Sequence, residues 1–273
     1  MNTHTNPLLQ IKQLSKTWAS GSSRSVLALD NFSFDVHDGE FLVIIGPSGC
    51  GKSTLLYTIA GLESPTTGTI TLEGSAVTHP SPDRSLIFQE PSLFPWLSAL
   101  DNVEWGLKIR GMPKTERRDC AMHFLKKVGL ADSAKKYPHE LSGGMKQRVA
   151  IARALCLQPK VLLMDEPFAA LDVQTRYQMQ NFLLEIWEST HITVVFVTHH
   201  IDEAIHLADR VLVLTARPGR ILEEVPVALP RPREIASSAF DDYRTSFFAH
   251  LRSEVSKAFA EQELAEVIDA TIK

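Results

Sequence analysis

Short apolar runs and longer helical patterns alternate along most of the chain. Four runs, at residues 41–45, 86–88, 161–164 and 194–197, are apolar throughout, which predicts buried strands. Residues 100–157 instead carry apolar positions at helical spacing. Strands that alternate with helices predict an α/β protein, in which a helical subdomain covers about residues 92–157.

The two ends of the chain follow different patterns. Residues 8–36 alternate apolar and polar positions up to the Asp38-Gly39 turn, which predicts an antiparallel β meander. Residues 211–214 and 221–229 predict two further strands, and the Pro-Arg-Pro-Arg stretch at 230–233 predicts a linker. The amphipathic stretch at 240–272 predicts a helix that packs on the rest of the chain, with the docking of a regulatory partner as the alternative. We therefore expect a main domain over residues 1–229 and an extension over residues 230–273.

Composition narrows the class of protein. With 273 residues, 44% of them hydrophobic, the chain can bury a sizeable core. A net charge of -4 gives no basic face and argues against nucleic acid as a partner. No apolar run is long enough to span a membrane and the N-terminus lacks a signal-peptide layout, so we expect the chain to stay in the cytosol. Cys50, Cys120 and Cys156 are widely spaced and are expected to be reduced thiols.

A phosphate-binding loop follows the first buried run. GPSGCGKS, at Gly46 to Ser53, fits the pattern G-x-x-x-x-G-K-[ST] and lies between a predicted strand and a predicted helix. A chance glycine-rich turn is the alternative, and the strand–loop–helix setting argues against it. The glycines let successive N–H groups point at phosphate, Lys52 is expected to reach the β and γ phosphates, and the Ser53 hydroxyl is expected to bind Mg²⁺.

Two later stretches carry further candidate chemistry. LSGGMKQR contains Ser142, an ordinary helix N-cap, followed by Gly143 and Gly144, which leave bare N–H groups suited to an anion. Asp165 and Glu166 follow a buried run directly, where a ligand would bind at the end of a parallel strand. Asp165 suits a contact to Mg²⁺, and Glu166 could polarise an attacking water. A solvated loop start is the alternative for this acidic pair.

Three other features have two interpretations each. Trp18 is either a core or rim aromatic or a platform for a nucleobase. His199 is either an ordinary loop histidine or a contact to a γ-phosphate, and a metal cluster of His199, His200 and His206 is a remote third option. The apolar loop at residues 90–96 either folds back into the core or docks on a partner.

Taken together and in this order, these motifs resemble the ATP-binding cassette family, the nucleotide-binding subunits of ABC transporters. The resemblance covers residues 8–229, and LSGGMKQR distinguishes this family from kinases and GTPases. It implies a P-loop NTPase fold with a RecA-like core sheet, the antiparallel meander and the inserted helical subdomain. The departure from the family pattern is His200, where Asp usually follows the switch histidine.

The resemblance also implies a role for each motif. Trp18 takes the place of the aromatic residue that stacks on adenine, Gln89 matches the Q-loop glutamine, and Asp172 falls in the D-loop. The implied catalytic residues are Lys52, Gln89, Glu166 and His199, and the implied Mg²⁺ ligands are Ser53, Gln89 and Asp165. The implied ATP contacts are Trp18, Gly46, Pro47, Ser48, Gly49, Cys50, Gly51, Lys52, Ser53, Thr54, Ser142, Gly143, Gly144 and Asp172.

A finer resemblance, carried by IFQEPSLFPWLSALDNVEWGL and PGRILEEVPVALPRPR, is to cassettes for nitrate, sulfonate, taurine and bicarbonate uptake. It implies an ATP-driven importer subunit that works as a homodimer, with permease subunits and an extracytoplasmic solute-binding protein, on the cytoplasmic face of the cell membrane. In such cassettes the permease docks on the segment after the Q-loop, which favours docking for residues 93–96. Two alternatives are a soluble ABC ATPase acting on ribosomes or DNA, which usually has two cassettes or a coiled-coil insertion, and a P-loop phosphotransferase, which needs no LSGG.

Overall fold

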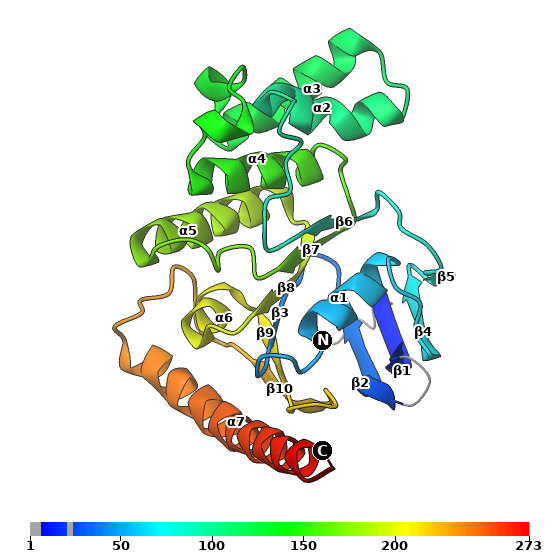
Figure 1. Cartoon of the computed structure of the whole chain (residues 1–273). Helices are drawn as coiled ribbons and strands as arrows, with labels where there is room; N and C mark the ends of the chain where they lie inside the picture. The colour runs from blue at the N-terminus through cyan, green and yellow to red at the C-terminus, as the bar shows by residue number, and fades with distance from the viewer. Residues whose placement is uncertain (1–6, 21–23, 273) are drawn as a thin grey trace. The chain divides into compact units, whose positions relative to one another are not determined.

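The computed structural model describes residues 7–20 and 24–272, so small parts of the expected ranges 1–229 and 230–273 lie outside it (Figure 1). The chain divides into two compact units. One unit holds Met1–His79 and Phe196–Lys273, and the other holds Pro80–Val195. The strand β8 (Thr193–Thr198) carries the chain from the second unit back into the first.

The antiparallel sheet of the first unit is built around β1 (Leu9–Ser20). It pairs antiparallel with β2 (Arg24–Val36) on one side and with β4 (Thr67–Leu72) on the other, and β5 (Ser75–Ala76) pairs with β4. The alternating pattern of residues 8–36 therefore predicted β1 and β2 and their antiparallel pairing correctly. The full order is β2-β1-β4-β5, so β1 lies between β2 and β4.

A second group of strands in this unit precedes and follows the phosphate-binding loop. The fully buried β3 (Phe41–Ile45) pairs in parallel with β9 (Arg210–Leu214), and β9 pairs antiparallel with β10 (Ile221–Pro226). The expected strand over 221–229 ends early, at Pro226. The reason is that the Ala228 N–H bonds to the Tyr243 hydroxyl instead of continuing the ladder.

The helices of the first unit are α1 (Lys52–Ala60), α6 (Ile201–Leu207) and α7 (Ser238–Ile272). The helix α7 contacts α6 and β9, and Phe240 and Phe247 on α7 are fully buried. Its expected role as a packing element is confirmed for the described side chains. The 230–233 stretch is more than a linker, because the buried Arg233 guanidinium donates to the carbonyls of Ile205, Ala208 and Val227.

His206 on α6 makes the stability of this unit depend on pH. Burial, and then the charges of Arg233 and Arg231, lower the pKa of His206 from 6.5 to about 4. The unfolded chain therefore takes up a proton first as the pH falls below 6.5, and stability is lost progressively down to about pH 4. We expect His206 alone to lower the free energy of unfolding by about 2 kcal/mol between pH 7 and pH 5.

Urea unfolding of the wild type and of His206→Gln at these two pH values measures this effect. The variant should lose clearly less free energy of unfolding on acidification than the wild type, because Gln carries no titrating group. Equal losses in the two proteins would contradict the expectation.

The second unit combines two strands with four α-helices. The strand β6 (Arg84–Ile87) pairs in parallel with β7 (Val161–Asp165). The helices are α2 (Ala99–Ile109), α3 (Lys114–Lys127), α4 (Gly143–Leu155) and α5 (Val173–Thr190), with short 3₁₀ turns at Ala131–Ser133 and Pro138–Glu140. Phe88 was expected in a buried strand, but it follows β6 and is 38% exposed.

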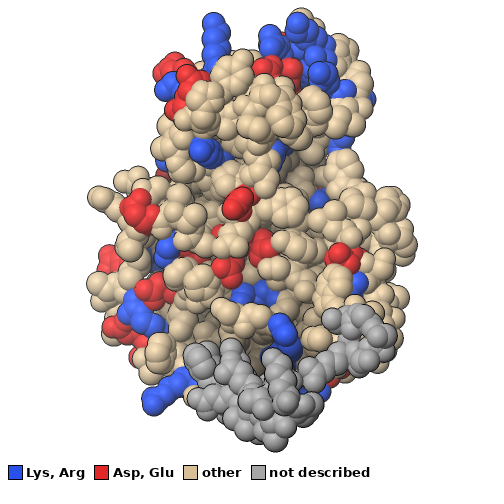
Figure 2. Space-filling view, in the orientation of Figure 1, with Lys and Arg blue, Asp and Glu red and all other residues tan. Residues whose placement is uncertain are grey.

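The helices α2, α3 and α4 contact one another, which confirms the helical pattern of residues 100–157. Cys120 on α3 and Cys156 after α4 bring their Sγ atoms to 3.5 Å, and all three cysteines of the chain are thiols. On the face shown in Figure 2, Lys and Arg side chains lie over the end formed by α2 and α3 with Asp and Glu beside them, and both kinds are interspersed over the rest of the face. Among the described helices, none has both the length and the apolar stretch needed to cross a bilayer.

Candidate nucleotide-binding site

The phosphate-binding loop lies between β3 and α1 in the first unit. Gly51 has a φ of 101° and is the N-cap of α1. A Cβ at this position would lie 2.9 Å from the Ala28 carbonyl oxygen, so only glycine fits without a shift. The buried Lys52 Nζ donates to the carbonyls of Gly46 (2.9 Å) and Pro47 (3.0 Å), which holds the ammonium within the loop.

The remaining loop residues have the exposure that a phosphate cradle needs. Ser48 and Gly49 are exposed, and Ser53 and Thr54 in the first turn of α1 are half-buried. Cys50 is buried, and burial raises the pKa of its thiol, which argues against a role as a nucleophile. The loop thus offers backbone N–H groups, a lysine and two hydroxyls at the start of one helix.

Trp18 lies at the end of β1 and is 39% exposed. The Lys16 ammonium lies 4.3 Å from the centre of its ring. This exposure excludes the core interpretation of Trp18 and leaves a rim aromatic or a stacking platform.

His199 follows β8 and is exposed, with its ring 4.2 Å from that of His200. The turn is fixed by Thr198, whose hydroxyl donates to Glu203 (2.5 Å) and accepts from the His200 N–H (3.0 Å). Within residues 7–20 and 24–272, no group of three His, Cys, Asp or Glu side chains is placed to hold a metal ion, so the remote option of a three-histidine cluster is wrong. The physical reason is that His206 is buried inside α6 while His199 is exposed.

In the second unit, Ser142 is the N-cap of α4. Its side chain accepts from the Met145 N–H (3.3 Å), as a capping serine does. Ser142 and Gly143 are exposed and Gly144 is half-buried. The positive end of α4 is therefore open to a ligand at its first turn.

Three acidic residues of this unit lie at or just after the ends of regular elements. Asp165 ends β7 and is 4% exposed, whereas Glu166 is half-buried. Glu166 has a φ of 44°, a left-handed conformation that costs a non-glycine residue energy and is often found at functional sites. Asp172 caps α5, where the Thr175 N–H (3.0 Å) lowers the pKa of the Asp172 carboxyl.

The segment after β6 contains a loop at residues 90–96 with two aromatic residues, Phe94 and Trp96, here called the aromatic loop. Gln89 is exposed two residues after the end of the strand. Further on, the Asn102 side chain accepts from the Phe94 N–H (2.9 Å) and donates to the Phe94 and Leu97 carbonyls (3.2 and 3.0 Å). The loop is thus held from α2 while Trp96 is 67% exposed, so it does not fold back completely into the core.

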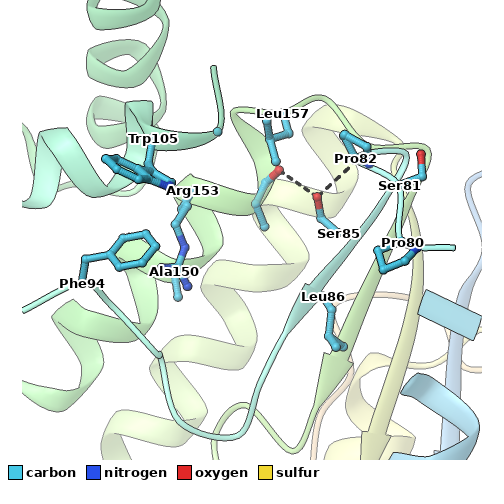
Figure 3. A pocket seen from close by; sticks show the side chains of 12 residues that line it. Pro80, Ser81, Pro82, Ser85, Leu86, Phe94, Trp105, Ala150, Arg153 and Leu157 are labelled. Atoms are coloured by element: carbon cyan, nitrogen blue, oxygen red, sulfur yellow. Dashed lines mark hydrogen bonds between the residues drawn. The ribbon is translucent and has the colours of Figure 1, made fainter. Parts of the chain in front are cut away.

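A pocket of about 400 Å³ lies beside this loop (Figure 3). Arg153 of α4 points into it, and its guanidinium donates to the carbonyls of Ser92 (2.9 Å) and Pro91 (3.0 Å). Burial lowers the pKa of Arg153. The arginine therefore ties α4, the helix that Ser142 caps, to the loop that follows Gln89. The pocket lining includes Pro80, Ser85, Phe94, Trp105 and Leu157.

Sequence reasoning missed two residues at the phosphate-binding loop. The stretch at 217–220 lies between the two strands predicted at 211–214 and 221–229, and its sequence assigned it no functional role. The Arg217 guanidinium nevertheless donates to the Gly49 carbonyl at 3.1 and 3.2 Å. Gly219 lies so close that a Cβ there would be 2.1 Å from the Cys50 carbonyl oxygen. An arginine and a glycine in one turn were the only signal, because the contact spans 168 residues of sequence.

The family model described as "ABC transporter" matches residues 29–169. The chain belongs to the ABC transporter family. It is 50% identical to the nitrate import ATP-binding protein NrtD of Synechocystis over 83% of this chain and 85% of that protein. It is 46% identical to the taurine import ATP-binding protein TauB of Rhizobium johnstonii over 91% of this chain and 95% of that protein.

A solved ABC cassette has the same fold. The dimeric structure of a post-hydrolysis state bound to ADP and Pi superposes with a TM-score of 0.71 at 34% identity, covering 81% of this chain and all of that one. The expected P-loop ABC cassette fold is thereby confirmed. The individual residue roles in this ABC chain stay predictions.

Proposed function

We propose that this ABC chain is the ATP-hydrolysing subunit of an importer for a small anion such as nitrate, an alkanesulfonate, taurine or bicarbonate. The observation that carries the proposal is the phosphate-binding loop, in which Lys52 is held at the loop carbonyls and Gly51 opens α1. Its relatives named for nitrate and taurine import support the solute class. A soluble ATPase acting on ribosomes or DNA is not favoured by these relatives.

In the proposed site, the loop N–H groups and Lys52 bind the triphosphate, and Trp18 stacks on adenine. Glu166 takes a proton from the attacking water, and His199 contacts the γ-phosphate. Charge that develops on the transferred phosphoryl group is then stabilised by Lys52. Gln89 orients the water and links the site to the aromatic loop.

The donor set also fits Mg²⁺. A hydroxyl at Ser53, an amide oxygen at Gln89 and a carboxylate at Asp165 are the hard oxygen ligands that Mg²⁺ prefers. When bound, Mg²⁺ would neutralise charge on the β and γ phosphates. We propose these three residues as its protein ligands.

One chain carries one phosphate-binding loop and one LSGG helix end, and the open first turn of α4 suits a phosphate. We therefore propose a head-to-tail homodimer in which Ser142, Gly143 and Gly144 of one copy complete the ATP site of the other, with Asp172 near the same boundary. The structure of a relative bound to ADP and Pi is dimeric, which supports the pairing of two copies. ATP would close the dimer because its γ-phosphate contacts the second copy, and hydrolysis would reopen it.

The aromatic loop is the proposed contact to permease subunits at the cytoplasmic face of the cell membrane, with an extracytoplasmic solute-binding protein delivering the anion. Trp96 is exposed on a loop that Asn102 holds in shape, which suits an aromatic anchor for a partner. Arg153 joins this loop to α4. Movement at the LSGG end of α4 would thereby reach the permease.

Uptake by a cell that lacks this chain tests the proposal. Labelled nitrate, taurine, an alkanesulfonate and bicarbonate are supplied in parallel, and the chain is returned as wild type or as Lys52→Ala. We expect one uptake to be lost, to be restored by the wild type and to stay lost with Lys52→Ala. If all four uptakes are unaffected by loss of the chain, the proposed solute class is wrong.

A further inference from the structure

The turn at residues 215–220 lies between the phosphate-binding loop and the C-terminal helix. On one side Arg217 donates to the Gly49 carbonyl, and Gly219 packs against the Cys50 carbonyl. On the other side the Ala216 N–H donates to the Glu254 carboxylate of α7 at 2.9 Å. The turn therefore joins two parts of the chain that no motif connects.

The turn is held rigidly enough to transmit a shift. The Gly219 N–H donates to the Ala28 carbonyl (3.0 Å), and the Asp30 N–H donates to the Gly219 carbonyl (2.9 Å). The Thr215 hydroxyl accepts from the Arg220 N–H at 2.9 Å, which closes the turn on itself. Because these hydrogen bonds hold the turn rigid, we expect a displacement of Ala216 to move Arg217 as well.

Glu254 is unusual for a charged residue on a C-terminal helix, because it is only 3% exposed. A buried carboxylate is costly unless it is well bonded, so its position is tightly defined. The helix is anchored near it by the buried Phe247 and further back by Arg244, whose guanidinium donates to Asp202 at 2.7 Å. Asp202 lies in the first turn of α6, directly after the His199-His200 pair.

Arg217 contacts the phosphate-binding loop at the carbonyl of Gly49. Gly49 has a φ of 75°, and the guanidinium holds its carbonyl by two N–H groups. Because the peptide bond is planar, these two hydrogen bonds fix the peptide plane between Gly49 and Cys50, and with it the path of the loop toward Gly51 and Lys52. The charge of Arg217 also reaches the loop: burial raises the pKa of the Cys50 thiol, and the charges of Lys52 and Arg217 oppose that shift.

We infer that Arg217 and Glu254 are positioning residues for the phosphate-binding loop, through which α7 sets the affinity of the site for ATP. The inference rests on the nucleotide-binding role proposed for Lys52 and its loop. It gives the C-terminal extension a part in the ATP cycle beyond packing.

The dissociation constant of a fluorescent ATP analogue, together with KM and kcat for ATP hydrolysis by the full-length chain, tests this inference. Arg217→Ala should raise the dissociation constant and KM about tenfold, as expected for a lost charge-assisted contact, and leave kcat within about twofold. Arg217→Lys should recover most of the affinity, because the lysine ammonium keeps the positive charge and can still donate a hydrogen bond to the Gly49 carbonyl. Arg220→Ala is the matched control, since it removes an exposed ion pair with Asp30 from the same turn.

Glu254→Leu should reproduce the loss of affinity, and Glu254→Gln, which keeps an acceptor oxygen, should stay close to wild type. The double variant Arg217→Ala/Glu254→Leu should be no weaker than Arg217→Ala alone, because both changes release the same loop. Three outcomes would overturn the inference: an unchanged dissociation constant in Arg217→Ala, an equal rise in Arg220→Ala, or a double variant whose loss is the product of the two single losses. If Lys52→Ala binds the analogue as tightly as the wild type, the proposed role of the loop in nucleotide binding is wrong. That result differs from the three outcomes above, which concern only the positioning role of Arg217 and Glu254.

Discussion

Replacing Glu166 by Gln is expected to lower ATP hydrolysis by about 100- to 10,000-fold while ATP binding is retained. Gln has the size of Glu and keeps an oxygen for hydrogen bonding, but it cannot take a proton from water. Glu166 follows the buried end of β7 in a left-handed conformation, which indicates that its position is fixed for a purpose other than packing. The steady-state ATPase rate and the dissociation constant of a fluorescent ATP analogue measure the two effects separately.

Glu185→Gln is the matched control for this variant. Glu185 is exposed on α5 in the same unit, so the same change of chemistry there should leave hydrolysis at the wild-type rate. Hydrolysis by Glu166→Gln at the wild-type rate would show that the role given to Glu166 is wrong. A parallel loss of ATP binding would show that Glu166 holds the nucleotide rather than the water.

The second large effect concerns the two halves of the proposed composite site. Lys52→Ala and Ser142→Asp should each abolish hydrolysis alone, since one removes the lysine at the phosphates and the other places a negative charge where a phosphate should bind. An equal mixture should recover about a quarter of the wild-type rate, because half of the dimers are mixed and each has one intact site. ATPase activity of the single variants and of the mixture, after subunit exchange, measures this.

The variant Ser142→Asp tests the effect of a negative charge at the proposed phosphate site without unfolding the start of α4. Asp is as good an N-cap as Ser, so α4 should keep its first turn. Ser142→Asn is also a good N-cap but has no charge, and it should keep most of the activity. If the mixture is as inactive as its components, Ser142 and Lys52 serve the same site in one chain and the trans arrangement is wrong.

Periodicity was enough to predict most elements of the fold. Three short runs that are apolar throughout form the buried strands β3, β7 and β8, and the amphipathic stretch forms the helix α7. In each case the spacing of the apolar residues is compatible with only one kind of secondary structure. The errors lie at element ends. The hydrophobicity of Phe88 predicted that it belongs to the strand that ends at Ile87. The predicted strand over 221–229 was longer than β10, because the end of β10 depends on a contact to the hydroxyl of Tyr243, 15 residues from Ala228.

The parts of the candidate site that could be predicted are those whose functional residues are consecutive in the sequence. The phosphate-binding loop and the LSGG stretch are each recognisable from the spacing of a few neighbouring residues, and that spacing also predicts their local structure. Gly51 is the N-cap of α1, and Ser142 is the N-cap of α4. Arg217 and Glu254 were not predictable, since an arginine in a turn and a glutamate in a helix have no pattern. Their significance comes only from contacts across the fold.

The central claim is that two copies of this chain close on ATP, and the mass of Glu166→Gln in solution tests it most directly. Light scattering after size exclusion should give a dimer with ATP and a monomer with ADP or without nucleotide. Adding Lys52→Ala to the same variant should keep it monomeric with ATP. A monomer in ATP for Glu166→Gln, under conditions where the analogue is bound, would contradict the account.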